Sequence, residues 1–316
     1  MLNDLAIEAR GLTRYFDSRM VVSDFDLSIP RGSVTGLLGL NGAGKTTTLR
    51  ILMGLLAPTR GESYLLGKNS QCLTPDDRAR IGYTVEGHFL YGWMTVRQSE
   101  KFHRETFPRW NAGMFDATVR RFGIEPSQKI RHLSRGQKAG VSLALTMAAE
   151  PELLVLDDPA LGLDPVSRLA LNETLLDFCD GGTKTILLSS HLLDDVERVA
   201  DRVAVMVHGR LVVNTTVDDF RSRVSSWAIE HSPATRGVES IPGLVHSRQL
   251  GGKTVVTLAD CDQETEAALT RIGGATCERL PITFDEAVIA YLSRSRESHS
   301  FLSSNSKRGQ ERMALD

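Results

Sequence analysis

A glycine-rich segment, flanked by an apolar run and a helical pattern, constrains this chain more than any other feature of its sequence. Residues Gly39 to Thr46 read GLNGAGKT and fit the pattern GxxxxGK[ST]. The apolar run Ser33 to Gly39 has the length of a buried strand, and Lys45 to Leu56 has the apolar spacing of a helix that stops before Pro58. The sequence therefore predicts a strand, a tight loop and a helix in direct succession.

This segment has the chemistry of a phosphate-binding loop. Its glycines allow consecutive backbone N–H groups to turn toward an anion at the positive end of the following helix. Lys45 is expected to reach the β- and γ-phosphates, and the hydroxyl of Thr46 to bind Mg²⁺. A nucleoside triphosphate is the expected ligand.

Two acidic residues and a histidine follow later apolar runs. Asp157 and Asp158 end the run Leu153 to Leu156, and His191 ends the run Thr185 to Ser190. The carboxyl ends of parallel strands share one edge of a sheet, where ligands bind. Beside a phosphate loop, the first acid is the natural partner of Mg²⁺, and the second can orient or deprotonate the attacking water. We expect a neutral His191 to hydrogen-bond a γ-phosphate or to hold that water.

Strand and helix patterns alternate along most of the chain. A strand-rich start at residues 5–29 precedes the phosphate loop, and a mainly helical stretch at residues 96–149 separates two strands. Alternation of this kind predicts a mainly parallel sheet covered on both faces. We expect an α/β domain over residues 1–222 with a helical insertion at about 88–150, a small α+β domain over residues 223–292, and a disordered polar tail over residues 293–316.

Composition narrows the class of protein further. The 316 residues leave room for one large domain and a smaller one, and a formal net charge of −2 argues against nucleic acid as a partner. No apolar run approaches the roughly 18 residues of a membrane-spanning helix, and the N-terminus lacks the layout of a secretory signal. The 4 cysteines are scattered and predict neither a zinc site nor a disulfide framework. We expect the chain to stay in the compartment where it is made.

Five motifs, in order and spacing, resemble the motif set of ABC-type ATPases over about residues 5–211. They are the phosphate loop, LSRGQ at residues 133–137, the acidic pair, LGLD at residues 161–164, and Ser190 with His191. The resemblance implies a P-loop NTPase fold of ABC type, in the α/β class, with an antiparallel β subdomain, a helical insertion and a small α+β C-terminal appendage. It also implies ATP and Mg²⁺ as cofactors and ATP hydrolysis as the reaction.

The resemblance further implies which residues form the site. Tyr15 is expected to stack on adenine, and Thr46, Asp157 and Glu86 to hold Mg²⁺. The residues expected to be catalytic are Asp158, His191 and Glu86. Those expected to hold the phosphates are Gly39, Leu40, Asn41, Gly42, Ala43, Gly44, Lys45, Thr46 and Thr47. In this family the signature segment, here Ser134, Gly136 and Gln137, caps ATP bound to the opposite subunit, so a head-to-tail dimer is implied.

The sequence departs from the family's motifs at three positions. Glu86 stands where a glutamine is usual, and glutamate can still bind metal and accept from water. Arg135 replaces the second glycine of the signature segment, with modest consequences expected. Asp158 replaces the usual catalytic glutamate. The loss of one methylene withdraws the carboxylate by roughly 1.5 Å, which predicts slow hydrolysis unless a backbone shift restores the reach.

The resemblance favours the ATP-binding subunit of a transporter whose permease is a separate membrane protein. One supporting feature is the aromatic cluster Phe89, Tyr91 and Trp93, where the family docks a helix of its membrane partner; the alternative is that these side chains belong to the core of the helical insertion. The C-terminal domain and residues 107–111 resemble bacterial exporters of the bacitracin-resistance type, which favours export. A cytoplasmic location on the inner face of the membrane follows from this class.

Two other hypotheses remain open from the sequence. The chain could be a soluble ATPase that uses ATP binding as a dimer switch, because Asp158 weakens hydrolysis. It could also be the weak-site half of a mixed dimer with another ATPase subunit, where the signature segment serves the partner's site. The sequence alone does not choose between a homodimer and a mixed dimer.

Overall fold

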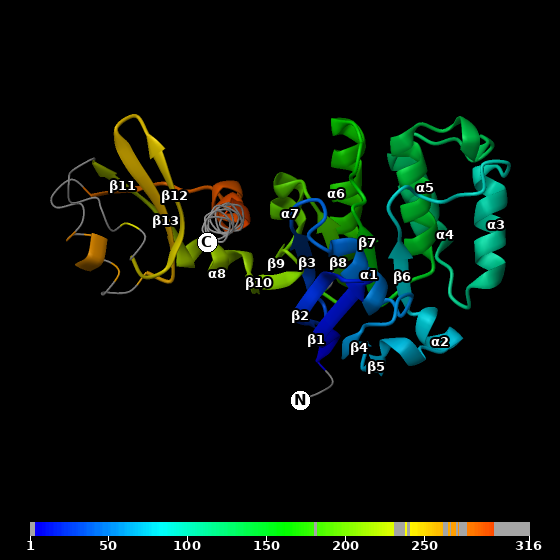
Figure 1. Ribbon diagram of the computed structural model, residues 1–316. Helices are drawn as coiled ribbons and strands as arrows, with labels where there is room; N and C mark the ends of the chain where they lie inside the picture. Colours follow the sequence, from blue (N-terminus) through cyan, green and yellow to red (C-terminus); the bar gives the residue numbers. More distant parts are fainter. Residues whose placement is uncertain are drawn as a thin grey trace, which may run out of the picture. The chain divides into compact units, whose positions relative to one another are not determined.

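The protein divides into two compact units, residues 1–214 and 215–316 (Figure 1). The computed structural model describes residues 4–179, 182–230, 238, 241–261, 265, 267–269, 271 and 277–293. The predicted tail, residues 293–316, lies outside the described residues except for Ser293. Within the described part of the chain, no helix combines the length and the apolar character needed to cross a membrane.

The first unit begins with an antiparallel sheet. Its strands are β1 (Leu5–Phe16), β2 (Arg19–Pro30), β4 (Arg60–Leu65) and β5 (Lys68–Asn69), in the order β2-β1-β4-β5. Along the second half of β2, Phe25, Leu27 and Ile29 are buried while the residues between them are exposed. This alternation is typical of a sheet with one face toward the core and the other toward water, and it confirms the predicted antiparallel start.

The second sheet of this unit has six strands in the order β10-β9-β3-β8-β7-β6. They are β3 (Val34–Leu38), β6 (Ile81–Thr84), β7 (Leu153–Asp157), β8 (Thr185–Ser190), β9 (Arg202–Val207) and β10 (Arg210–Thr216). The pairs from β9 through β3, β8 and β7 to β6 are parallel. Every residue of β3, β7 and β8 is buried, because helices cover both faces of a parallel sheet. These are the strands that the sequence shows as continuous apolar runs.

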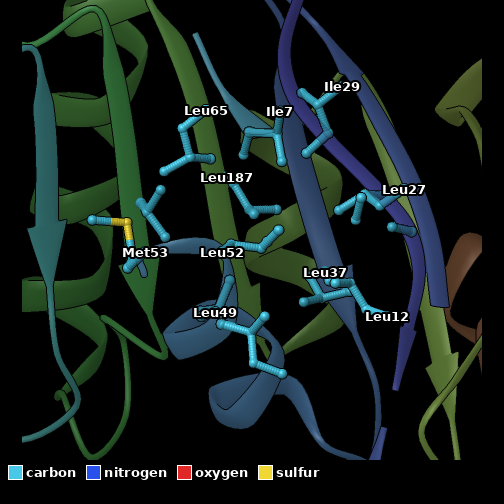
Figure 2. Packing of buried hydrophobic residues seen from close by; sticks show 14 of the residues in the cluster. Ile7, Leu12, Leu27, Ile29, Leu37, Leu49, Leu52, Met53, Leu65 and Leu187 are labelled. Atoms are coloured by element: carbon cyan, nitrogen blue, oxygen red, sulfur yellow. The ribbon is translucent and has the colours of Figure 1, made fainter. Parts of the chain in front are cut away.

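One hydrophobic core joins the two sheets through helix α1 (Lys45–Leu52). Figure 2 shows Leu49 and Leu52 of α1 among Leu37 and Leu187 of the parallel sheet and among side chains of the antiparallel sheet. The antiparallel sheet contributes buried residues that include Ile7, Leu12, Leu27, Ile29 and Leu65. Because α1 follows the phosphate loop directly, this packing fixes the position of the loop.

Helices α3 (Val96–Thr106), α4 (Ala112–Arg121) and α5 (Arg135–Ala148) form the predicted insertion between β6 and β7. Each starts at a side-chain cap, provided by Thr95, Asn111 and Ser134 respectively. The other helices of this unit are α2 (Pro75–Arg78), α6 (Pro165–Cys179) and α7 (Leu193–Val199), with 3₁₀ turns η1 (Ser70–Cys72) and η2 (Ile130–His132). The α/β class, the antiparallel subdomain and the helical insertion are as predicted.

The second unit contains α8 (Val217–Arg223) and an antiparallel sheet. The sheet order is β12-β13-β11-β14, from β11 (Val224–Glu230), β12 (Leu244–Leu250), β13 (Lys253–Ala259) and β14 (Glu278–Leu280). Residues 284–293 are helical, and between residues 262 and 276 only residues 265, 267–269 and 271 are described. Phe220 of α8 contacts the rings of Phe284 and Tyr291. Because these contacts place α8 in the second unit, the unit boundary at 214 precedes the predicted boundary at 222.

Candidate functional site

The phosphate loop connects the carboxyl end of β3 to the start of α1. Gly44 has a φ of 108° at the position before the helix, and a Cβ there would lie 2.7 Å from the carbonyl oxygen of Val21. Only glycine fits such a backbone at such a close contact. No side chain caps the first N–H groups of α1, so they are free to donate to an anion.

Lys45 is held inside the loop. Its Nζ donates to the carbonyl oxygens of Gly39 and Leu40 at 2.7 and 3.3 Å, and the residue is 8% exposed. Burial lowers the pKa of Lys45, an effect that the charges of Asp158, Asp157 and Glu86 oppose. A buried ammonium group beside open N–H groups is a site for a multiply charged anion.

Asp157 connects three elements at the edge of the parallel sheet. It ends β7 and is buried, and its Oδ1 accepts from Thr46 Oγ1 at 3.1 Å and from Ser189 Oγ at 2.9 Å. Thr46 comes from α1 and Ser189 from β8. The predicted meeting of the phosphate loop with the first acid is therefore present in the structure.

Asp158 has an unusual backbone and a half-satisfied carboxylate. Its φ is 47°, in the left-handed region, and its N–H donates to Ser189 Oγ at 2.9 Å. The Nδ1 of His191 lies 2.8 Å from Asp158 Oδ2, so the imidazole donates to the carboxylate. The other oxygen, Oδ1, is buried and has no hydrogen-bond partner among the described residues. One carboxylate oxygen is thus fixed and the other is available.

A cavity of about 450 Å³ lies over these groups. Its walls are formed by Arg19, Val21, Asn41, Gly42, Gly44, Lys45, Thr46, Thr47, Glu86, Asp157, Asp158 and Leu161. Most of these residues belong to the set expected from the sequence, and Arg19, Val21 and Leu161 do not. Ser189 was also missed, although its place just before Ser190 and His191, at the carboxyl end of β8, is a signal that could have identified it.

Several expected site residues lie outside the cavity wall. Gly39, Leu40 and Ala43 belong to the loop itself, where Ala43 N–H donates to the carbonyl of Leu40, and His191 reaches the site through Asp158. Tyr15 is 41% exposed and does not line the cavity. The residues of the signature segment, Ser134, Gly136 and Gln137, are likewise not among the lining residues that the structure describes.

In this chain the signature segment forms the start of α5. Ser134 Oγ accepts from Gln137 N–H at 3.2 Å, and Gln137 Oε1 accepts from Ser134 N–H at 3.0 Å, so the two form a capping box. Gly136 is buried against Ser167, whose Oγ would lie 2.1 Å from an added Cβ. Ser167 Oγ in turn donates to Asp164 at 2.6 Å. The segment is therefore fixed to the loop at residues 161–164.

The lining residues suit a magnesium ion that also binds phosphate. In the described part of the chain, no three His, Cys, Asp or Glu side chains are arranged to hold a metal by themselves. Thr46 and Asp157 nevertheless offer oxygen atoms side by side, and Glu86 lines the same cavity. Mg²⁺ prefers one or two protein oxygens together with substrate phosphates, so this incomplete set fits the ion.

Comparison with known proteins agrees with this geometry. A sequence model described as ABC transporter matches residues 22–161. The bacitracin transport ATP-binding protein BcrA of Bacillus licheniformis is 30% identical over 219 residues, covering 69% of this chain and 72% of the relative. The Nod factor export ATP-binding protein I of Rhizobium johnstonii is 32% identical over 217 residues, covering 67% and 69%.

A solved structure described as the ATP binding subunit of an ABC transporter superposes with a TM-score of 0.62. It is 29% identical in sequence, and the match covers 69% of this chain and 92% of that one. The matched stretches of 219 and 217 residues are about as long as the first unit of this chain, and the solved structure shares its fold. The chain therefore belongs to the ABC transporter family, as an ATP-binding subunit.

Proposed function

We propose that the cavity binds ATP with Mg²⁺ and that the chain hydrolyses the γ-phosphate. The observation that supports this most directly is the contact of Thr46 with Asp157 beside the buried Lys45. Lys45 and the open N–H groups of α1 would hold the phosphates, and Thr46, Asp157 and Glu86 would hold the metal. Mg²⁺, when bound, neutralises charge on the β- and γ-phosphates. Tyr15 would contact the adenine.

Asp158 is proposed as the group that orients and deprotonates the attacking water. Its free Oδ1 can accept a hydrogen bond from water, while His191 fixes Oδ2 and therefore the plane of the carboxylate. The aspartate is shorter than the glutamate usual in the family, so we propose that hydrolysis is slow.

The signature segment is proposed to complete the site of a second subunit. Ser134 and Arg135 are exposed, and neither lines the cavity of its own chain. A head-to-tail dimer would bring Ser134, Gly136 and Gln137 of one chain to the ATP of the other. Either a second copy of this chain or a related ATPase chain could be the partner.

A membrane permease is the proposed second partner. Phe89, Tyr91 and Trp93 are 85%, 57% and 66% exposed, which argues against a role in the core of the helical insertion. Beside them lies a cavity of about 220 Å³ whose lining includes Phe89, Leu90 and Phe107. A cytoplasmic segment of the permease with an apolar side would fit such a surface. Binding to this partner would place the chain on the inner face of the membrane. Export is favoured because the two relatives are named for bacitracin transport and for Nod factor export.

Two experiments test this function. Lys45→Ala should abolish ATP binding and hydrolysis, while Lys68→Ala, at an exposed residue of β5, should leave both unchanged. Retained turnover in the Lys45 variant would overturn the site assignment.

Extraction of the tagged chain from its own cells in mild detergent should recover a polytopic membrane protein together with the chain. A second ATPase chain in the complex would identify a mixed dimer. Recovery of the chain alone, dimerised by ATP, would instead support a soluble dimer switch.

A further inference from the structure

The cavity has a cationic residue that belongs to no motif. Arg19 is the first residue of β2 and pairs with Phe16 across the turn from β1. Side chains of a strand alternate between its two faces, and Arg19 and Val21 both line the cavity while Met20 between them does not. Arg19 therefore faces the same space as the phosphate loop.

The start of β2 is fixed against that loop. The Val21 carbonyl lies so close to Gly44 and Gly209 that added Cβ atoms would be 2.7 and 2.5 Å from it. Further along β2, the N–H of Ser23 donates to the carbonyl oxygen of Gly209 at 2.9 Å. Because this backbone is held on one side by the loop, the position of Arg19 relative to Lys45 is set by the fold.

Arg19 has no direct ion-pair partner among the residues that the structure describes. Its side chain is exposed and makes no hydrogen bond with any of these residues. The only other cation lining the cavity among the described residues is Lys45, whose Nζ is occupied by two carbonyl oxygens. A triphosphate bound over α1 would also face the carboxylates of Glu86, Asp157 and Asp158. A second cation would reduce that repulsion.

We propose that Arg19 binds the phosphate chain of ATP from the β2 side of the cavity. A guanidinium group presents several N–H donors in a fixed plane and can bind two phosphate oxygens together. This inference rests on the proposed function, since it requires a nucleotide in the cavity. It makes Arg19 a determinant of affinity for nucleotides according to the charge of their phosphate chain.

The test is isothermal titration calorimetry. ATP is titrated in the presence of Mg²⁺ into the full-length protein and into its Arg19→Ala variant. The control is Arg60→Ala, at an exposed arginine on β4 of the same sheet that does not line the cavity. Arg19→Ala should bind ATP about tenfold more weakly than wild type, and raising the salt concentration should narrow that difference. The affinity of Arg19→Lys for ATP should lie between those of wild type and Arg19→Ala, because lysine keeps the charge but lacks the planar guanidinium group.

Three results would overturn the inference. They are an unchanged ATP affinity in Arg19→Ala, an equal loss in Arg60→Ala, and full affinity in Arg19→Gln, which lacks the charge. These failures differ from a failure of the proposed function. In that case wild type would not bind ATP, or Lys45→Ala would bind ATP with the affinity of wild type. If wild type binds ATP, Lys45→Ala does not, and Arg19→Ala matches wild type, only the role of Arg19 is wrong.

Discussion

Asp158 is the single residue whose identity most affects the expected rate of hydrolysis. Asp158→Asn keeps the size of the side chain but removes the charge, so it should lower kcat by on the order of 10²-fold or more and leave the Kd for ATP nearly unchanged. Asp158→Glu should raise kcat above that of wild type, because the longer side chain carries the carboxylate further toward the γ-phosphate. Steady-state ATPase assays with separate binding titrations measure both quantities.

The backbone at Asp158 sets a control for this comparison. Its φ of 47° is tolerated better by aspartate and asparagine than by glutamate. The free energy of unfolding of each variant is therefore measured beside its activity. A stable Asp158→Glu variant with turnover no higher than wild type would show that reach does not limit the rate.

Arg135, which replaces the second glycine of the signature segment, makes a contact that the sequence did not predict. Its guanidinium lies over Gly162, where an added Cβ would be 2.4 Å from Nη1. Gly162 also has a φ of 69°. The guanidinium is the far end of an exposed, flexible side chain and can move aside, so Gly162→Ala should lower the free energy of unfolding by about 1 kcal/mol through the left-handed backbone alone. Chemical denaturation should give nearly the same cost in the Arg135→Gly background, and a much larger cost in wild type would contradict this account.

Sequence patterns identified most of the cavity residues that belong to motifs, with Leu161 as the exception, and missed those that belong to none. Lys45, Thr46, Asp157 and Asp158 stand at fixed spacings next to apolar runs, and the structure brings all four to one cavity. Arg19 and Ser189 are ordinary strand residues in sequence. Their relevance arises from the pairing of β2 and β8 with distant segments, which no local spacing encodes. The catalytic and binding roles assigned to the motif residues stay predictions.

At the scale of elements, buried strands and long helices were the easiest to predict. The continuous apolar runs became β3, β7 and β8, and the capped, amphipathic segments became α3 and α5. Strand β10 was missed, and none of its residues is fully buried, since they alternate between exposed and partly buried. Helix α8 was not predicted, and its contacts, those of Phe220 with Phe284 and Tyr291, join residues far apart in sequence.

A charged pair joins the starts of β6 and β7, at the edge of the sheet away from the cavity. Arg80 precedes β6 and Glu152 precedes β7, and Arg80 Nε and Nη2 donate to the two oxygens of Glu152 at 2.7 Å each. The hydrogen bonds from Arg80 lower the pKa of Glu152. Glu152→Gln should therefore reduce the free energy of unfolding at pH 7 by about 1 kcal/mol.

The same pair predicts a dependence on pH. A carboxylate whose pKa is lowered in the folded state stabilises the protein above its unfolded pKa of about 4.3, and this stabilisation is lost as the pH falls through the folded value. The difference between wild type and Glu152→Gln should therefore close in acid. Glu105→Gln is the matched control, since its i,i+4 pair with Lys101 is exposed and spans 3.9 Å. A constant difference between the two proteins from pH 7 to pH 3 would rule out the pair as its cause.

At the scale of the whole molecule, the cavity and the signature segment lie in the same unit but do not meet within one chain. Every residue that lines the cavity belongs to the first unit, as does the signature segment. Ser134 and Gln137 use their side chains to cap α5 and do not line the cavity of their own chain. If these residues act on ATP, a second chain provides the contact. The proposed composite site would then belong to the assembly of two chains and not to one chain alone.

Mixing two inactive variants tests whether the site is shared between chains. Lys45→Ala disables the phosphate loop and leaves the signature segment intact. Ser134→Asp disables the signature segment, because aspartate still caps α5 while its negative charge repels a phosphate. A mixed dimer of these chains has one site in which the phosphate loop of the Ser134→Asp chain meets the signature segment of the Lys45→Ala chain. Random mixing of equal amounts should restore about a quarter of the wild-type ATPase activity, because half of the dimers have one of two sites intact.

Controls separate this result from its alternatives. Each variant alone should remain inactive at the same total concentration, and a chain with both substitutions should rescue neither. If the signature segment acted on the ATP of its own chain, each subunit of the mixed dimer would still lack one of the two elements. Mixing would then restore no activity, even when both variants are folded and dimeric by light scattering. Such an outcome would disprove the head-to-tail arrangement while leaving the phosphate-binding role of Lys45 to its own test.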